Sequence, residues 1–431
     1  MTNSLTSNTT RQVARVFLEA FDAARVITKS VDTQLLSGKF SPRSGSTVDF
    51  KRPHDYTTYR NASGDLTSYT KPDIISGKAT GTVQDYFSSA TEWDSVEEAL
   101  ELDQLDQIIA PMATRICQDL ETDFAKYMAQ NCGTSYAASG TYGTAVATWA
   151  DIASAGAHMK SLGVPIDKQW NYCMNPHTTV TLANAQSALS AGSNSNVDNA
   201  WNKAVINSNF AGFNVMESTH LHGFTSATTG DLIGAVNGTM DVSYVTAKDT
   251  MTQDIIVQSF GSFAGAADSL KGQAVTVTAG SGALNQLSLS TRSPIVDAAG
   301  ANVLWTGIIV SNTSFSGGAG TLTVSGPALY EANGAYNTVS QALASADVIT
   351  ILGADATFYQ PNLAYHPQAF GLGTVKLPKL YSTDTLATTK DGMSMRVSKY
   401  SDGDTNKQKI RFDLLPAYST FNPWLAMQAW G

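Results

Sequence analysis

The chain has 431 residues, of which 42% are hydrophobic and only 15% are charged, and its formal net charge is −9. This length allows two or three domains with a sizeable core, and the acidic balance argues against a surface that neutralises nucleic-acid phosphates over its whole area. The sequence has no apolar leader and no run of about 18 apolar residues, so we expect neither a signal peptide nor a membrane span.

The first two segments are predicted to be a helix and a long hairpin. In residues 5–36 the apolar residues recur at three- and four-residue spacing, which predicts a helix after a polar lead. Residues 44–90 alternate as two extended runs around a polar, turn-rich stretch. An isolated hairpin is marginal in water, and no apolar partner stands near it in the sequence. We therefore expect a neighbouring copy of the chain to support it.

The middle of the chain is predicted to be mixed α/β. An apolar stripe with helical period predicts a long helix from about Leu105 to Gln130, started or kinked by Pro111. A helix at Trp149–Leu162 with Gly163 as its cap, a short strand at Trp170–Met174, and a helix over 178–189 follow.

From about Gly223 to Gly353 charges almost vanish, and short β-like runs alternate with Gly and Ser turns. This spacing predicts a small β-barrel or sandwich inserted into the main domain. The expected strands are 240–245, 255–260, 273–277, 302–310, 321–324 and 348–352. A closing hairpin is predicted from the alternation at 393–397 and 410–414, with its turn at 401–404.

Every motif that resembles a chemical site has a stronger structural interpretation. Ser76-Gly77-Lys78 lacks the earlier glycine of a phosphate loop and precedes a strand, and Asp402, Asp404 and Asn406 lack the glycine and the glutamate of a calcium loop. His220 and His222 have no third ligand nearby. The cysteines Cys117, Cys132 and Cys173 are odd in number and lack CxxC spacing, which indicates free thiols in a reducing cytoplasm, with Cys173 in the core. We expect no catalysis, no cofactor and no metal.

Six runs of sequence resemble the coat proteins of short-tailed temperate enterobacterial phages. They are LLSGKF (35–40), DFKRPH (49–54), IISGKATG (74–81), DLETDFAKYM (119–128), VKLPKLYS (375–382) and KYSDGDTNKQKIRFDLLPAYSTFNP (399–423). The resemblance spans nearly the whole chain and is weakest between 224 and 353. It implies an α+β fold of the Hong Kong 97 phage capsid type (HK97-like) with an additional telokin-like insertion.

The resemblance also implies a division of the chain. Residues 1–39 would form an N-terminal arm and residues 40–90 an extended loop (E-loop) lying over the adjacent subunit. Residues 91–222 would hold the spine helix of the peripheral domain and the first part of the axial domain. Residues 223–354 would form the inserted β-barrel, with a protruding loop at 246–253 that bridges capsomers, and residues 355–431 the remainder of the axial and peripheral domains.

The implied function is a major capsid protein that assembles with scaffolding protein into an icosahedral shell enclosing double-stranded DNA. Its expected partners are itself, as hexamers and pentamers, scaffolding protein, portal protein and non-specifically held DNA, but no membrane. The protein would be assembled in the host cytoplasm and reside in the virion. The inter-subunit contact candidates are Lys51, Arg52, Arg60, Lys71, Lys78, Glu97, Glu98, Glu101, Lys248 and Asp249. Arg11 and Arg15 are candidates for contacting scaffold.

Two alternatives belong to other functional classes. One is another virion component, such as a decoration or tail protein. The other is a β-rich carbohydrate-active protein, which needs two carboxylates about 5–10 Å apart in an aromatic cleft, and no acidic pair here has that context.

Overall fold

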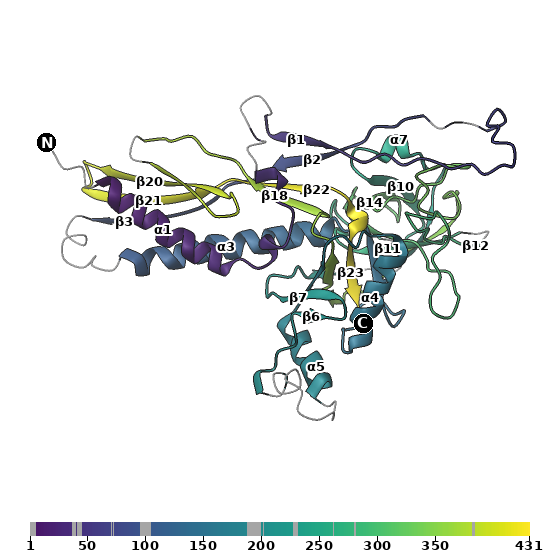
Figure 1. Ribbon diagram of the computed structural model, residues 1–431, viewed down its shortest axis with the longest axis horizontal. Coiled ribbons are helices and arrows are strands. Elements are labelled where there is room, and N and C mark those ends of the chain that lie inside the picture. Colours follow the sequence, from purple (N-terminus) through teal and green to yellow (C-terminus); the bar gives the residue numbers. More distant parts are fainter. Residues whose placement is uncertain are drawn as a thin grey trace. The chain divides into compact units, whose positions relative to one another are not determined.

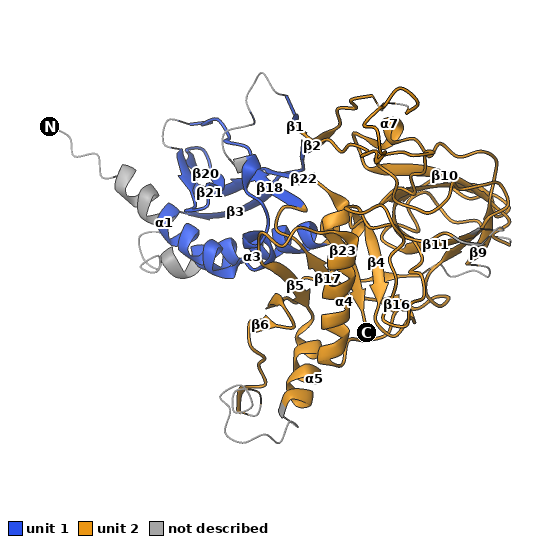
Figure 2. Ribbon diagram, turned by 45° about the vertical axis from the view of Figure 1, so that its right-hand side comes forward, with its two compact units in different colours: residues 1–49, 80–125, 370–420 blue, residues 50–79, 126–369, 421–431 orange. Residues whose placement is uncertain are grey.

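The computed structural model describes residues 6–36, 40, 45–69, 71, 73–94, 105–187, 200, 202–226, 232–261, 263–279, 282–381 and 384–431. The chain divides into two compact units, each assembled from separated stretches (Figure 2). Unit 1 contains residues 1–49, 80–125 and 370–420, and unit 2 contains residues 50–79, 126–369 and 421–431.

Unit 1 combines helices with an antiparallel sheet (Figure 1). Its helices are α1 (Thr6–Ala24) and the larger part of α3 (Leu105–Gln130), and Pro111 lies inside α3. The sheet has the order β19-β20-β21-β3, with strands Thr385–Thr388, Ser394–Asp402, Lys407–Leu414 and Phe87–Asp94. The closing hairpin is thus confirmed as β20 and β21, and its apolar face packs on α1, where Phe412 stacks on Phe17 with ring centroids 4.2 Å apart.

The predicted first helix is too long, because α1 ends at Ala24 and two short 3-10 turns follow, at Ile27–Lys29 and Gln34–Leu36. The cause is a buried carboxylate on α3. The amides of Val26, Ile27 and Thr28 donate to Glu121 instead of continuing the helix.

A second four-stranded sheet has the order β1-β2-β22-β18. Its strands are Thr47–Lys51, Lys78–Val83, Pro416–Thr420 and Phe370–Thr374. The hairpin stem predicted within 44–90 is confirmed as β1 and β2. Strand β3 does not belong to that hairpin, because it pairs with β21 along its whole length.

The α/β part of unit 2 is a six-stranded sheet with the order β4-β23-β17-β5-β7-β6. Its strands are Thr134–Ala137, Ala426–Trp430, Asn362–Tyr365, Trp170–Met174, Phe213–Glu217 and Asn209–Phe210. Helices α4 (Trp149–Leu162) and α5 (Pro176–Ser187) accompany it, together with a short 3-10 turn at Pro423–Leu425 and the small pair β8 (Phe224–Thr225) and β16 (Phe358–Tyr359). Helix α4 starts with a Thr148–Asp151 capping box and ends at left-handed Gly163, so its predicted bounds are confirmed.

The low-charge region forms a closed β-barrel. The strands run β11-β13-β14-β10-β9-β15, and β15 pairs back onto β11 to close it. Their bounds are Ala274–Ala279, Thr306–Asn312, Gly320–Ser325, Thr252–Gln258, Ile233–Val236 and Val348–Ile351, and the short β12 (Gly282–Ala283) pairs antiparallel with the end of β11. Closure removes the exposed strand edges that such β-rich sequence would otherwise present.

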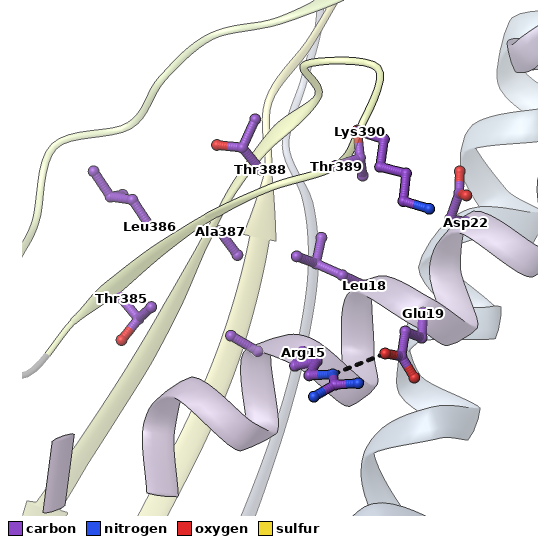
Figure 3. Close-up of a pocket in the computed structure, with 11 residues that line it drawn as sticks. Arg15, Leu18, Glu19, Asp22, Thr385, Leu386, Ala387, Thr388, Thr389 and Lys390 are labelled. Carbon is purple, nitrogen blue, oxygen red and sulfur yellow. Dashed lines mark hydrogen bonds and ion pairs between the residues drawn. The ribbon is translucent and has the colours of Figure 1, made fainter. Parts of the chain in front are cut away.

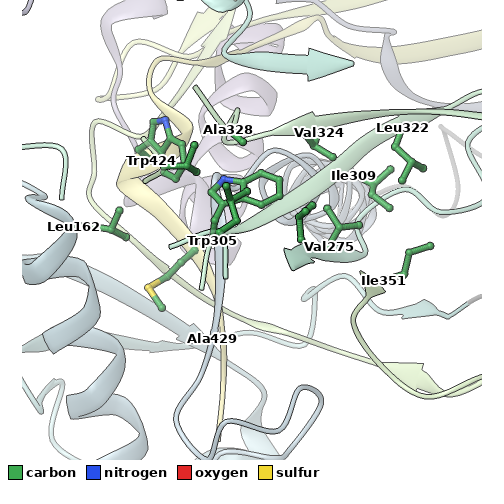
Figure 4. Packing of buried hydrophobic residues seen from close by; sticks show 14 of the residues in the cluster. Leu162, Val275, Trp305, Ile309, Leu322, Val324, Ala328, Ile351, Trp424 and Ala429 are labelled. Atoms are coloured by element: carbon green, nitrogen blue, oxygen red, sulfur yellow. The ribbon is translucent and has the colours of Figure 1, made fainter. Parts of the chain in front are cut away.

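Alternate residues of these strands point inward and form the barrel core. Val275, Ile309, Leu322, Val324 and Ile351 are buried there and belong to one apolar cluster with Trp305 and Trp424 (Figure 4). The indole N–H of Trp305 donates to the carbonyl of Gly326 at 3.0 Å, which satisfies the polar atom of this fully buried side chain. The predicted barrel is therefore confirmed.

The prediction of a strand at 240–245 is wrong, because the structure has helix α7 (Tyr244–Ala247) there. The Ser243 hydroxyl accepts from the amide of Val245, and the Asp241 carboxylate accepts from the amide of Ser243 and the hydroxyl of Thr246. These short polar side chains hold a capped turn in place of a strand ladder. The barrel strand that the sequence analysis missed is β9.

One buried histidine in unit 2 makes the stability of the fold depend on pH in the acidic range. His158 on α4 is 6% exposed, stacks on Tyr136 with ring centroids 4.6 Å apart, and its Nε2 has no hydrogen-bond partner among the described residues. Burial lowers the pKa of His158 to about 4. The unfolded chain therefore binds an extra proton between pH 6.5 and 4, and stability falls as the pH falls through that window.

We expect His158→Phe to weaken the pH dependence of the free energy of unfolding, because a phenyl ring can keep the stack on Tyr136 but does not titrate. The wild-type free energy of unfolding should drop by about 2 kcal/mol more than that of the variant between pH 7.5 and pH 5. Urea unfolding followed by tryptophan fluorescence measures this mainly for unit 2, since only Trp93 of the seven tryptophans belongs to unit 1. His177→Gln, at an exposed position, is the matched control. The same pH dependence of the free energy of unfolding in wild type and His158→Phe would contradict the prediction.

Candidate functional site

The candidate contact residues centre on the long excursion between β1 and β2. We call residues 52–55 and 75–78 the loop root and residues 56–74 the distal loop. Both segments lie entirely in unit 2, and so does the barrel. The contacts of the root with the barrel and its connections can therefore be followed within one compact body.

Arg52 is a buried member of the loop root, at 7% exposure. Its Nε–H donates to the carbonyl of Lys78 at 2.9 Å, and its two terminal nitrogens donate to the carbonyls of Phe421 and Asp249. Burial lowers the pKa of Arg52, and nearby Tyr244 and Asp249 oppose the shift. A planar guanidinium donates from three separate nitrogens and so reaches three carbonyls that lie apart, whereas the three donors of a lysine ammonium radiate from one atom.

Asp55 forms the second attachment of the root. Its amide donates to the Tyr336 hydroxyl at 3.0 Å, and its carboxylate pairs with the guanidinium of Arg292. Arg292 also donates to the carbonyl of Asn337 at 2.8 Å and has a left-handed backbone, with φ of 55°. Both partners of Asp55 come from connections between barrel strands.

The returning side of the root lies against the α7 segment. Ile75 packs on the apolar cluster of Tyr244, Ala247 and Leu329, and Tyr244 stacks flat on Tyr336 with ring centroids 3.7 Å apart. The amide of Lys78 donates to the Asp249 carboxylate at 3.2 Å. A Cβ on Gly77 would lie 2.6 Å from the carbonyl oxygen of Lys248, so only glycine allows this close approach.

These contacts correct the expectation that residues 44–90 have no support within their own chain. The loop root is held by the barrel connections, and Arg52 is buried there instead of facing solvent. The sequence analysis missed Asp55, Arg292, Tyr244 and Tyr336 as functional residues. No local pattern could have found the Asp55–Arg292 pair, because 237 positions separate its members.

The distal loop carries large apolar side chains that are exposed. Its apolar side chains Tyr56, Leu66 and Ile74 are 59%, 39% and 73% exposed. Of the charged candidates on the excursion and its stem, Lys51, Arg60, Lys71 and Lys78 are exposed. Lys248 and Asp249 are half-buried beside the root, and Glu97, Glu98 and Glu101 lie outside the described residues.

A separate groove lies in unit 1, between α1 and β19. It has a volume of about 410 Å³ and is lined by Ala14, Leu18 and Asp22 of the helix and by residues 385–390 (Figure 3). Arg15 lies at this groove and pairs with Glu19 at 2.9 Å, with both side chains largely exposed. Arg11 lies on α1, and its side chain is outside the described residues.

The residues that resemble chemical motifs are placed as structural elements. Ser76-Gly77-Lys78 leads into strand β2, and Asp402 accepts from the amide of Asp404 in the hairpin turn. All three cysteines are buried and form no disulfide, and Cys173 lies on β5. Within the described ranges no group of three or more potential ligands is placed to hold a metal ion, and no helix is long and apolar enough to cross a membrane.

Comparisons with known proteins agree along the entire chain. The family model described as P22 coat protein - gene protein 5 matches residues 1–431. The "Major capsid protein" of Acyrthosiphon pisum secondary endosymbiont phage 1 is 38% identical over 439 aligned positions, covering 100% of both chains.

Among solved structures, the chain is similar to the capsid of cyanophage P-SCSP1u, with 12% identity, a TM-score of 0.43, and coverage of 90% of this chain and 84% of that chain. It is also similar to the capsid of Ralstonia phage GP4, with 7% identity, a TM-score of 0.43, and coverage of 93% and 87%. On the full-length family match and the 38% identical relative, the chain belongs to the P22 coat protein family of phage major capsid proteins.

Proposed function

We propose that this chain is the shell-forming subunit of a phage head. Copies of it assemble as hexamers and pentamers into a closed icosahedral shell, together with scaffolding and portal proteins, around double-stranded DNA. Assembly takes place in the host cytoplasm, and the product is the virion shell. The observation that carries the proposal is the family match from the first residue to the last.

The distal loop supplies the apolar part of the proposed contact between subunits. Full burial of one large aliphatic or aromatic side chain contributes about 1.5–3 kcal/mol. A sister copy that covers Tyr56, Leu66 and Ile74 therefore gains several kcal/mol from surface that is exposed in the single chain. Many moderate contacts of this size favour a closed shell, because wrong contacts can still dissociate.

The charged candidates would act at the rim of that contact. We propose that Lys51, Arg60, Lys71 and Lys78 face acidic residues such as Glu97, Glu98 and Glu101 of the next subunit. Each exposed pair contributes only about 0–1 kcal/mol, so these charges would set register and association rate more than affinity. Lys248 and the adjacent loop 246–253 would contact a neighbouring capsomer, and Arg11 and Arg15 would contact scaffolding protein beside the α1 groove.

We expect Ile74→Glu to slow shell assembly at least about tenfold while leaving the monomer folded, since an exposed position tolerates a charge but a buried contact does not. Ile166→Glu is the matched control, because Ile166 is the same residue type with the same 73% exposure outside the loop. Light scattering of purified protein with scaffolding protein measures the rate, and electron microscopy identifies the particles.

The outcomes separate the parts of the proposal. Closed shells from the wild-type chain support the shell function, whereas rings or tubes of one diameter would assign it to another part of the virion. Equal rates for both variants would remove the distal loop from the contact surface.

A further inference from the structure

The loop root and the distal loop differ in a way that suggests separate tasks. The root is held by three attachments to its own chain: the Arg52 guanidinium, the Asp55 carboxylate and amide, and the Ile75–Lys78 stretch against the α7 segment. The distal loop carries exposed apolar side chains beyond them. One end is therefore fixed in the single subunit and the other is left for a partner.

We infer that the inserted barrel acts as an intrachain anchor that fixes the direction in which the extended loop leaves the subunit, before any neighbour is bound. This inference rests on the proposed function in one respect, namely that the distal loop reaches a sister copy. Asp55, Arg292 and Gly77 are positioning residues in this account, because they hold the loop root to the rest of the chain and lie outside the surfaces proposed to meet a neighbour.

The direction in which the distal loop leaves the root determines where its tip lies. The 19 residues of the distal loop run out and back, so at the rise of an extended chain the tip lies up to about 30 Å from the root. A rotation of roughly 10° at the root then moves the tip by about 5 Å, beyond the range of any hydrogen bond or van der Waals contact. A loop attached at one point would rotate that far easily, and attachments on both strands prevent it.

The attachments are also specific to this position of the root. The guanidinium fork of Arg52 reaches carbonyls of three separated segments, which fixes both the depth and the orientation of the outgoing strand. The contact of Gly77 with the Lys248 carbonyl has no room for a methyl group, so the returning strand fits in one place. Arg292 keeps a left-handed backbone, uncommon for a residue with a long side chain, where it reaches Asp55.

The test uses charge reversal of the Asp55–Arg292 pair. Asp55→Arg and Arg292→Asp each bring like charges together, and the double reversal restores an opposite pair. Aspartate also tolerates the left-handed backbone at 292. In the monomer, we expect each single reversal to raise hydrogen exchange of the amides at 52–55 and 75–78 about tenfold and to slow shell assembly about tenfold. The double reversal should bring both quantities back to within about twofold of wild type.

A second variant tests the other strand independently. Gly77→Ala should loosen the same amides and slow assembly, whereas Gly403→Ala, where an added Cβ meets nothing within 4 Å, should do neither. Thermal unfolding of each monomer checks that the barrel itself stays folded.

Three results would overturn the anchor: reversals that leave the root protected, a loosened root with normal assembly, or a double reversal that rescues neither readout. Failure of the wild-type chain to form shells would instead reject the proposed function, and exchange at the root in the monomer would still decide whether the barrel holds the loop.

Discussion

Asp413→Ala should lower the local stability of unit 1 by about 3–5 kcal/mol, the usual cost of removing one partner from a buried ion pair. Asp413 is 1% exposed and lies between two arginines of the β20–β21 hairpin and β3. It accepts from Arg396 at 2.6 and 3.2 Å, from Arg411 at 2.6 Å and from Ser88 at 2.6 Å. Burial by itself raises the pKa of Asp413, but the hydrogen bonds from these three side chains outweigh it and the pKa lies below its ordinary value.

The loss is large because Arg396 is also buried and would keep its charge without a partner. Hydrogen exchange of the amides in 394–414 measures it locally, which suits a chain with two compact units better than a single unfolding midpoint. Arg411→Gln is the matched control, since the Arg411 side chain is 42% exposed and its loss should cost less than about 1 kcal/mol. Equal effects of the two substitutions would contradict the buried-pair account.

The second large effect is expected at Glu121, which joins the segment after α1 to helix α3. Its carboxylate accepts from the amides of Val26, Ile27 and Thr28 at 3.0, 2.8 and 3.1 Å and from the Thr28 hydroxyl at 2.5 Å. Glu121→Ala leaves these buried donors without an acceptor. Each such group costs about 1–3 kcal/mol, so we expect a loss of at least about 3 kcal/mol.

Glu121→Gln provides the graded comparison, because its amide oxygen keeps one acceptor while its NH₂ faces donors. The stability of the Glu121→Gln variant should lie between that of wild type and that of Glu121→Ala. Protease cleavage between residues 24 and 36 reports release of this segment, and far-ultraviolet circular dichroism checks that α3 persists. Cleavage at the wild-type rate in Glu121→Ala would show that the segment is held by its apolar residues alone, such as Ile27 and Leu35.

The elements predicted best are those that are determined by residues close together in the sequence. The bounds of α4 follow from Thr148, Asp151 and Gly163, all within or beside the helix. The β20–β21 hairpin follows from strict alternation around a polar turn, and the barrel from repeated short strands in a region nearly free of charge. The family resemblance rested on long contiguous runs, and the full-length match confirms a phage coat protein family.

Two of the predictions that failed were decided by side chains far away in the chain, and a third by polar capping within the segment itself. The first helix ends early because Glu121 takes amides that lie 93 to 95 positions away from it. The 240–245 strand was replaced by a turn that Asp241 and Ser243 cap, where apolar alternation and polar capping compete within six residues. Of the candidate contact residues, Arg52 could not be placed from sequence, since a charged residue in a polar hairpin looks solvated.

The amino-acid sequence by itself determined the family, the α+β class, the barrel and most element bounds, because periodicity, capping and turn residues act within a few positions of one another. Tertiary structure alone decided that the loop root rests on its own barrel and that the segment after α1 is held by α3. Arg52, Asp55 and Glu121 are held by hydrogen-bond partners from distant parts of the chain, and no local sequence pattern encodes these contacts.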